Sequence, residues 1–244
     1  MSKSQKQTVA ERIRTRFDSL TRAERQLANV IMENYPVSGL GSTTAVAEQA
    51  GVSTPTVVRM ARKLGFKGFP EMQAALRQEL EATITSPLAK HDSWNENAPD
   101  THILNRFADV IMENMVQTVR QIDADAFNRV AELLSDRKRG VHVVGGRITR
   151  ALADYLFTHM QVIRPGVTLV ATNANTWPHF VLNMQKGDVL VIFDIRRYER
   201  DLLRLAEIAK DQGVTLVLFT DQWGSPIAKH TEHVFHCRIE APSA

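Results

Sequence analysis

The spacing of apolar residues changes once along this chain of 244 residues, and that change most constrains the fold. Residues 9–80 place apolar side chains at helical spacing and contain no strand-like run. Further along, short runs that are apolar on both faces alternate with helical segments; these runs are 141–145, 167–171, 188–194, 214–220 and 233–237. Such strands are typical of a parallel sheet that helices cover on both sides. The sequence therefore predicts an all-α domain followed by an α/β three-layer domain with a five-stranded parallel sheet.

A polar segment separates the two patterns. Residues 83–100 contain Pro87 and Pro99 and show no periodicity, which is typical of a linker. We therefore expect a helical domain over 1–82, a linker over 83–100 and an α/β domain over 101–244. Helices are expected over 5–20, 21–34, 43–50, 53–64, 70–82, 101–122, 124–136, 147–160, 176–184 and 199–212, with a short helical turn over 225–229.

The basic excess of the chain lies in the first domain. Residues 1–82 hold 12 Lys and Arg against 8 Asp and Glu, whereas the remainder holds 18 against 19. The single cysteine, Cys237, cannot form an intramolecular disulfide, which favours a reducing compartment. No apolar run approaches the roughly 20 residues that span a bilayer. We expect a cytoplasmic protein that does not contact a membrane.

Residues 43–64 have the spacing of a helix-turn-helix. The small Ala47 lets two helices approach, Gly51 provides a tight turn, and Val57 packs between the helices. The second helix of such a motif presents its start and one side to the major groove of DNA. The residues that we place on this outward side are Ser53, Thr54, Thr56, Arg59, Arg62 and Lys63. Short hydroxyls can bind phosphate or base edges, Arg59 can reach a guanine, and Arg62 or Lys63 can bind phosphate.

A purely structural helical bundle is the alternative. Ser53 would then be only an N-cap, while Arg62 and Lys63 would complement the helix dipole. The turn spacing, the hydroxyl-rich helix start and the local basic excess together favour double-stranded DNA as the partner.

Two stretches resemble the N-terminal domain of the RpiR family of bacterial transcriptional regulators. They are SLTRAERQLANVIMENY (19–35) and STTAVAEQAGVSTPTVVRMARKLGFKGFPEMQAAL (42–76). The resemblance implies that a sugar isomerase (SIS) domain follows, which agrees with the strand pattern of the second half. SIS domains usually continue into a further helix after the last strand, so we expect the C-terminal helix of this domain to be missing from the sequence.

The first candidate ligand loop is Gly145-Gly146-Arg147-Ile148-Thr149, between a predicted strand and a predicted helix. In open parallel sheets, ligands bind at the carboxyl ends of the strands. Glycines let backbone amides approach an anion at a helix start, and Arg147 and Thr149 add a charge and a hydroxyl. The same glycines would also serve a close-packed turn.

The second candidate loop is 194–200, which contains Arg196 and Arg197. Two arginines at a strand end can fork onto a carboxylate or phosphate, or they can be a surface pair that balances nearby acids. Phosphosugar-binding SIS domains usually carry a Gly-x-Gly-x-Ser loop and a Ser-x-Ser-Gly-x-Thr loop. In this chain, GGRIT (145–149) resembles the first of these loops, whereas DIRRY (194–198) takes the place of the second. We therefore expect a small anionic effector, a sugar phosphate or a carboxylate, bound by the 145–149 loop and by Arg196 or Arg197.

These observations predict a ligand-responsive transcriptional regulator that acts as a homodimer or homotetramer. The alternative is an SIS-type sugar-phosphate isomerase with an accessory helical domain, which requires a positioned base. Asp194 and Glu199 lie near the second loop but form no compelling acid–base pair, so we expect no catalytic residues and no enzyme. We expect no cofactor and no metal, because the histidines at 230, 233 and 236 lie in an edge-like segment without a partnered ligand cluster.

Overall fold

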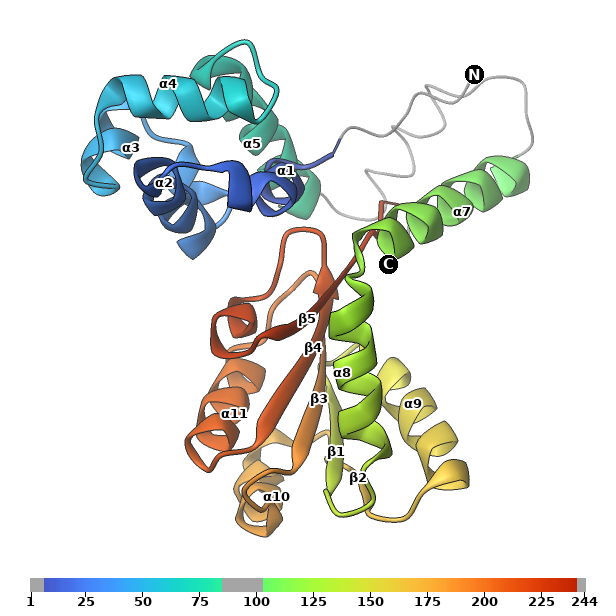
Figure 1. The fold of residues 1–244 in the computed structure, drawn as a ribbon. Coiled ribbons are helices and arrows are strands. Elements are labelled where there is room, and N and C mark those ends of the chain that lie inside the picture. The colour runs from blue at the N-terminus through green and yellow to red at the C-terminus, as the bar shows by residue number, and fades with distance from the viewer. Residues whose placement is uncertain (1–6, 85–102, 241–244) are drawn as a thin grey trace. The chain divides into compact units, whose positions relative to one another are not determined.

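The computed structural model describes residues 7–84 and 103–240. These residues divide into two compact units, one before and one after residues 85–102 in the sequence; Figure 1 shows the elements of each unit. The first unit is all-α and the second is α/β, which confirms the predicted fold class. The predicted linker lies outside the described residues, except that positions 83 and 84 still belong to a helix.

The first unit is a bundle of short helices around one apolar core. Its elements are α1 (Val9–Arg16), a 3-10 turn η1 (Phe17–Ser19), α2 (Arg22–Glu33), a 3-10 turn η2 (Val37–Gly39), α3 (Thr43–Gln49), α4 (Thr54–Lys63) and α5 (Phe69–Ile84). Side-chain caps set three of the helix starts. Thr8 and Thr21 each form a reciprocal capping box with the glutamate three residues on, and Ser42 accepts from the amide of Ala45. Because Thr8 caps α1, the helix begins at Val9 and not at residue 5 as predicted.

The second unit contains a five-stranded, fully parallel sheet in the order β2-β1-β3-β4-β5. Its helices are α7 (Ile103–Gln121), α8 (Ala124–Ser135), α9 (Arg150–Ile163), α10 (Trp177–Asn183) and α11 (Arg200–Asp211), with 3-10 turns η3 (Ala174–Thr176) and η4 (Pro226–His230). Its strands are β1 (Val141–Gly145), β2 (Val167–Leu169), β3 (Val189–Asp194), β4 (Thr215–Asp221) and β5 (His233–Cys237). All five predicted strands are present, and β5 is an edge strand as expected.

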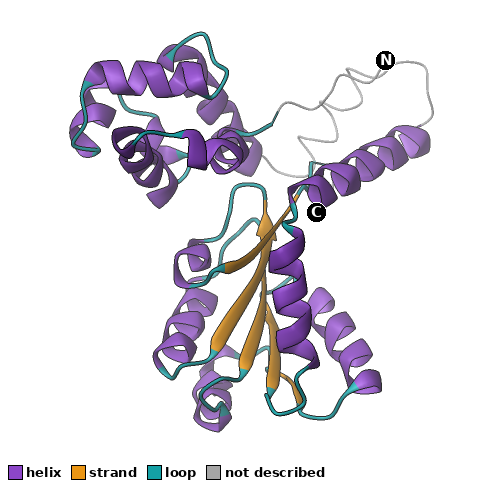
Figure 2. Ribbon diagram, in the orientation of Figure 1, coloured by secondary structure: helices purple, strands orange, loops and turns teal. Residues whose placement is uncertain are grey.

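Helices cover both faces of this sheet (Figure 2). On one face, α8 and α9 pack through Val130, Ala153 and Met160 against alternate residues of β1 and β3. On the other face, α10 and α11 pack through residues such as Trp177 and Leu205. The three central strands β1, β3 and β4 are largely buried because both faces of the sheet are covered, whereas the edge strands β2 and β5 are only partly buried.

The strand order brings the two candidate ligand loops together. The chain passes from β1 to β2 on one side of β1, and then to β3 on the other side. Gly145 at the end of β1 pairs in register with Phe193 near the end of β3. The loops that follow these strands therefore flank the topological switch point, where parallel α/β sheets bind their ligands.

Candidate DNA-binding helix and ligand-binding loops

Helices α3 and α4 form the predicted helix-turn-helix. Gly51 adopts a φ of 61°, a left-handed conformation that glycine accepts readily. The amide of Val52 then donates a 2.9 Å hydrogen bond to the carbonyl of Ala47, which closes the turn. Ala47 and Val57 are both buried in the core of the unit. The roles predicted for these residues in the turn are confirmed.

Fewer side chains are exposed on the outward side of α4 than the sequence predicts. Ser53, Thr54, Arg59 and Arg62 are exposed, whereas Thr56 is only 4% exposed. The Thr56 hydroxyl lies 2.9 Å from Oγ of Ser53 and accepts a 3.0 Å hydrogen bond from Nη2 of Arg59. Placing Thr56 on the outward side was therefore wrong, because this threonine packs inward and binds the Arg59 guanidinium.

The Lys63 ammonium is engaged within the unit. It donates to the carbonyl of Ser19 at 2.6 Å and lies 3.0 Å from Oε2 of Glu24. Burial acts to raise the pKa of Glu24, but hydrogen bonds from the Thr21 amide and from Lys63 outweigh it and lower that pKa. Lys63 thus ties the end of α4 to the start of α2, a role that the sequence analysis did not predict.

The first ligand loop is a close turn as well as a candidate anion site. A Cβ atom on Gly145 would lie 2.5 Å from the carbonyl oxygen of Thr149, so only glycine fits there. Thr149 is 8% exposed; its hydroxyl accepts from the Gly146 amide at 2.8 Å and donates to the Phe193 carbonyl at 2.6 Å. Helix α9 begins at Arg150, three residues later than predicted, because these bonds hold residues 146–149 in a turn. The glycines thus serve a close-packed turn, and the Thr149 hydroxyl is committed to that turn.

Glu199 connects the two loops. Its Oε1 accepts a 2.7 Å hydrogen bond from the backbone amide of Arg147. The same oxygen stands 2.7 Å from the point where a Cβ atom on Gly146 would lie. The carboxylate thus rests against the glycine backbone at the start of α9. The sequence signal for this contact was a glutamate five residues beyond a strand, which is not distinctive.

Asp221, at the end of β4, organises the second loop. Its Oδ2 accepts from the Arg196 amide at 2.6 Å, and its Oδ1 accepts from the Tyr198 hydroxyl at 2.6 Å and from the amides of Trp223 and Gly224 at 3.1 Å. Arg196 is half-buried, and its Nη2 atom is buried without a hydrogen-bond partner, whereas Arg197 is exposed. The sequence suggests Asp221 only as a turn residue, because its partners belong to another loop.

Asp194, the last residue of β3, is a buried carboxyl group. It is 3% exposed and accepts a 2.5 Å hydrogen bond from the hydroxyl of Ser225. Burial raises its pKa to about 6, and the charges of Asp221 and Glu199 add to this increase. This carboxyl group lies beneath the loops and does not face solvent.

The remaining candidates are structural. Within 7–84 and 103–240, no group of three or more His, Cys, Asp and Glu side chains could hold a metal ion. Nδ1 of His236 lies 3.0 Å from the Asp221 carbonyl. Burial, together with the charge of Asp221, raises the pKa of the Cys237 thiol, which makes it a weak nucleophile. No helix of the described part is long and apolar enough to cross a membrane.

Comparison with known proteins assigns both units to known domains. The helix-turn-helix domain of the rpiR family matches residues 7–83, and the SIS domain matches residues 133–244. These matches define a two-domain protein that joins a helix-turn-helix to an SIS domain. The HTH-type transcriptional regulator HexR of Pseudomonas aeruginosa is 27% identical over 225 residues, which cover 91% of this chain and 75% of HexR. The chain belongs to the RpiR family of transcriptional regulators.

Two solved structures have similar folds. The sugar isomerase domain of an RpiR transcription factor from Sphaerobacter thermophilus is 25% identical, with a TM-score of 0.52. The matched region covers 57% of this chain and 76% of the chain in that structure. The Vibrio vulnificus NanR protein, solved in complex with ManNAc-6P, is 18% identical, with a TM-score of 0.53 over 96% of this chain and 81% of NanR. Membership of this family implies DNA binding by the first domain and suggests a small effector for the second.

Proposed function

We propose that this regulator binds a double-stranded operator through α4 and senses a small anionic metabolite, a sugar phosphate or a carboxylate, with its SIS domain. The observation that carries the proposal is the exposed polar side of α4, where Ser53, Thr54, Arg59 and Arg62 stand on the second helix of a helix-turn-helix. Hydroxyls at a helix start and arginines along one side are the groups that bind phosphates and guanine edges. The buried Thr56 supports this surface through its hydrogen bond with Arg59, and Lys63 ties the end of α4 to Glu24.

The proposed effector site is the pair of loops at the switch point. The backbone of Gly145 and Gly146 lies at the start of α9, where partial positive charge favours an anion. Arg147, Arg196 and Arg197 add positive charge beside it. The complex of NanR with ManNAc-6P supports a phosphosugar as one form of this effector.

The protein is, in this proposal, not an enzyme. An isomerase needs a base that reaches its substrate. Asp194 is buried and bonded to Ser225, and the Glu199 carboxylate is bonded to the Arg147 amide. Neither carboxylate is presented as a base, which supports a sensing role over the isomerase alternative.

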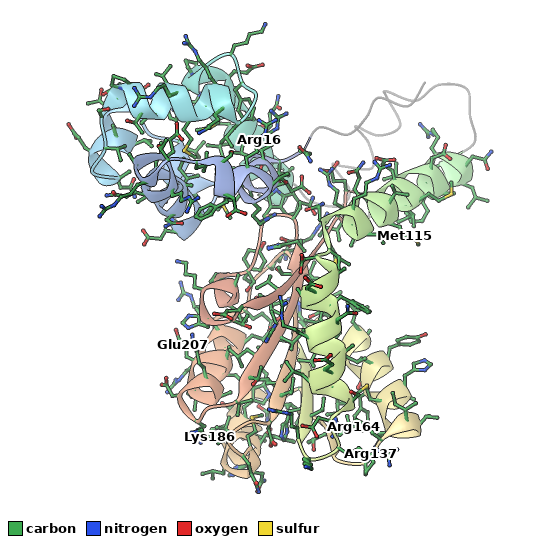
Figure 3. The ribbon with its side chains drawn as sticks, viewed as in Figure 1. Arg16, Met115, Arg137, Arg164, Lys186 and Glu207 are labelled. Atoms are coloured by element: carbon green, nitrogen blue, oxygen red, sulfur yellow. The ribbon has the colours of Figure 1, made fainter. Side chains whose placement is uncertain are left out.

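A homodimer or homotetramer is part of the same proposal. Large apolar side chains are exposed on α7 and α9; Met115 is 62% exposed (Figure 3) and Val162 is 82% exposed. A two-fold dimer would present two copies of α4 to the half-sites of a palindromic operator. The expected location is the cytoplasm, where a regulator reaches its operator, without membrane contact.

The DNA-binding part is tested by selection from a pool of random duplexes, followed by fluorescence anisotropy with the selected duplex. We expect the full chain to select a specific sequence, and Arg59→Ala and Arg62→Ala each to weaken binding about tenfold or more. Arg77→Ala is the control, because Arg77 is an exposed arginine on α5 of the same domain. A chain that selects no sequence would refute the proposed function.

The effector part is tested by a thermal-shift screen of sugar phosphates and small carboxylates on the full chain. A ligand stabilises the folded state in proportion to the logarithm of its concentration over its dissociation constant, so weak ligands also register. We expect a stabilising ligand that changes operator affinity and is not consumed. Turnover of a sugar phosphate would instead favour the isomerase.

A further inference from the structure

We propose that Glu199 is an internal competitor of the effector: its carboxylate occupies the anion position of the 145–149 loop, and an anionic ligand enters this position only by displacing it. The inference rests on the effector part of the proposed function, because it concerns the same ligand-binding loop, and it does not depend on the DNA-binding part. It adds a residue that sets which anions the site accepts.

The first support is the position of the carboxylate. Glu199 Oε1 accepts the 2.7 Å hydrogen bond from the Arg147 amide, at the end of the loop where an anion would bind. A Cβ atom on Gly146 would come within 3.0 Å of the carboxylate carbon as well as 2.7 Å of Oε1. The absence of a side chain at position 146 therefore provides the space that this carboxylate fills.

The second support is that the Glu199 side chain does not cap its own helix, α11. It is the N-cap residue of α11, yet its side chain makes no capping hydrogen bond there. Serine, threonine, aspartate and asparagine are the usual side-chain caps. The Glu199 carboxylate instead reaches a loop 52 residues earlier in the chain.

The third support is charge. Glu199 is close enough to Asp194 to contribute to its raised pKa, so negative charge already gathers beside this loop. A phosphate dianion that entered with Glu199 in place would meet repulsion from that charge and would find the Arg147 amide already bonded. Glu199 is half-exposed, so its side chain can rotate into water when a ligand replaces it.

The test uses the full chain, inorganic phosphate as the probe, and constant ionic strength. Calorimetric titration gives the dissociation constant, and amide NMR shifts of Gly146 and Arg147 locate the bound anion. We compare wild type with Glu199→Ala, which empties the position, and Glu199→Gln, which keeps the size and the acceptor oxygen but removes the charge. Asp201→Asn is the matched control, because Asp201 is an exposed carboxylate in the first turn of α11.

We expect Glu199→Ala to bind phosphate about tenfold or more tightly than wild type, a size typical of coupled ligand sites. Glu199→Gln should be intermediate, Asp201→Asn should match wild type, and the perturbed amides should be those of 146 and 147. If Glu199→Ala fails to fold, the isosteric Glu199→Gln decides alone. Affinities within about twofold of wild type for both variants, or shifts elsewhere in the domain, would overturn the inference.

The two proposals fail separately. If the chain selects an operator but loss of the Glu199 charge does not improve phosphate binding, the inference is wrong and the regulator proposal stands. If loss of that charge improves phosphate binding at the loop but the chain selects no duplex, the regulator proposal is wrong and the inference stands.

Discussion

Arg196 and Asp221 hold the second ligand loop in a strained conformation. The Arg196 amide donates a 2.6 Å hydrogen bond to Oδ2 of Asp221, while Arg196 has a φ of 66°. It is the one non-glycine residue with a positive φ among the described residues. For a residue with a Cβ atom, the left-handed region costs about 1–2 kcal/mol. The Asp221 carboxylate, fixed by further donors from Tyr198 and the following turn, offsets that cost.

This strain predicts an unusual order of stability for two variants at position 196. Arg196→Ala and Arg196→Gly both remove the guanidinium, but only glycine relieves the backbone. We expect Arg196→Gly to have the larger free energy of unfolding, by about 0.5–1 kcal/mol after its greater unfolded-state entropy is counted. Urea denaturation measures the difference. Position 197 is the control: φ is not positive there, so Arg197→Ala should be more stable than Arg197→Gly. Equal stabilities of Arg196→Ala and Arg196→Gly would contradict the prediction.

The buried carboxyl group of Asp194 predicts a specific pH dependence. Because its folded pKa of about 6 lies above the ordinary value of 3.8, protonation favours the folded state. Its contribution to stability is complete below about pH 4 and is lost as the pH rises through 6. Asp194→Asn removes this loss, which amounts to at most about 3 kcal/mol at about 1.4 kcal/mol per pKa unit.

The measurement is the free energy of unfolding of wild type and Asp194→Asn between pH 4 and pH 8. Carboxyl groups distant from position 194 contribute equally to both proteins, so the difference reports on Asp194 and its immediate surroundings. The asparagine variant should gain relative stability up to about pH 7, and the difference should then level off. A pH-independent difference would show that Asp194 does not titrate in this range.

Arg62 and Lys63 are adjacent basic residues with different expected roles in operator binding. Arg62 is exposed, so Arg62→Ala should reduce the slope of log affinity against log salt by about one phosphate contact. Lys63 is paired with Glu24, so Lys63→Ala should leave that slope unchanged. It should instead lower the free energy of unfolding by about 0.5–1 kcal/mol, since the ammonium is partly exposed and screened. Equal slope changes in both variants would mean that Lys63 also binds phosphate.

The hydrogen bond between Thr56 and Arg59 predicts that the Thr56 hydroxyl affects sequence recognition through the Arg59 guanidinium. Thr56→Val keeps the shape of the side chain but removes the hydroxyl that accepts from Arg59. We expect it to reduce discrimination at the base pair that Arg59 reads, with little effect on non-specific binding. Arg59→Ala should cost about 1–3 kcal/mol at the operator.

A double-mutant cycle measures this coupling from operator affinities. Thr56→Val should add almost nothing in the Arg59→Ala background, because its effect passes through the guanidinium. The control is Thr54→Val, at an exposed position of the same helix, whose effect should be additive with Arg59→Ala. If Thr56→Val were also additive with Arg59→Ala, Thr56 would have no role in the sequence recognition by Arg59.

The sequence by itself determined the elements of both domains, because their signals act over a few residues. The apolar periodicity and the glycine turn at Gly51 place most helix ends to within a few residues, and the side-chain caps of Thr21 and Ser42 lie at two of these ends. Five runs that are apolar on both faces identify the five strands. These short-range patterns, together with the resemblance to a known family, were enough for the fold class and the order of the domains.

Only the tertiary structure decided which polar side chains are available to a ligand. Lys63 meets Glu24 across 39 residues, Asp221 meets Arg196 across 25, and Glu199 meets Arg147 across 52. Apolar periodicity predicts which face of an element is buried, but it carries no information on which distant polar group will lie opposite a given side chain. The packing of α4 on α2 and the pairing of β3 with both β1 and β4 bring these residues together. These contacts determine which polar groups remain available on the DNA-binding helix and at the anion loop.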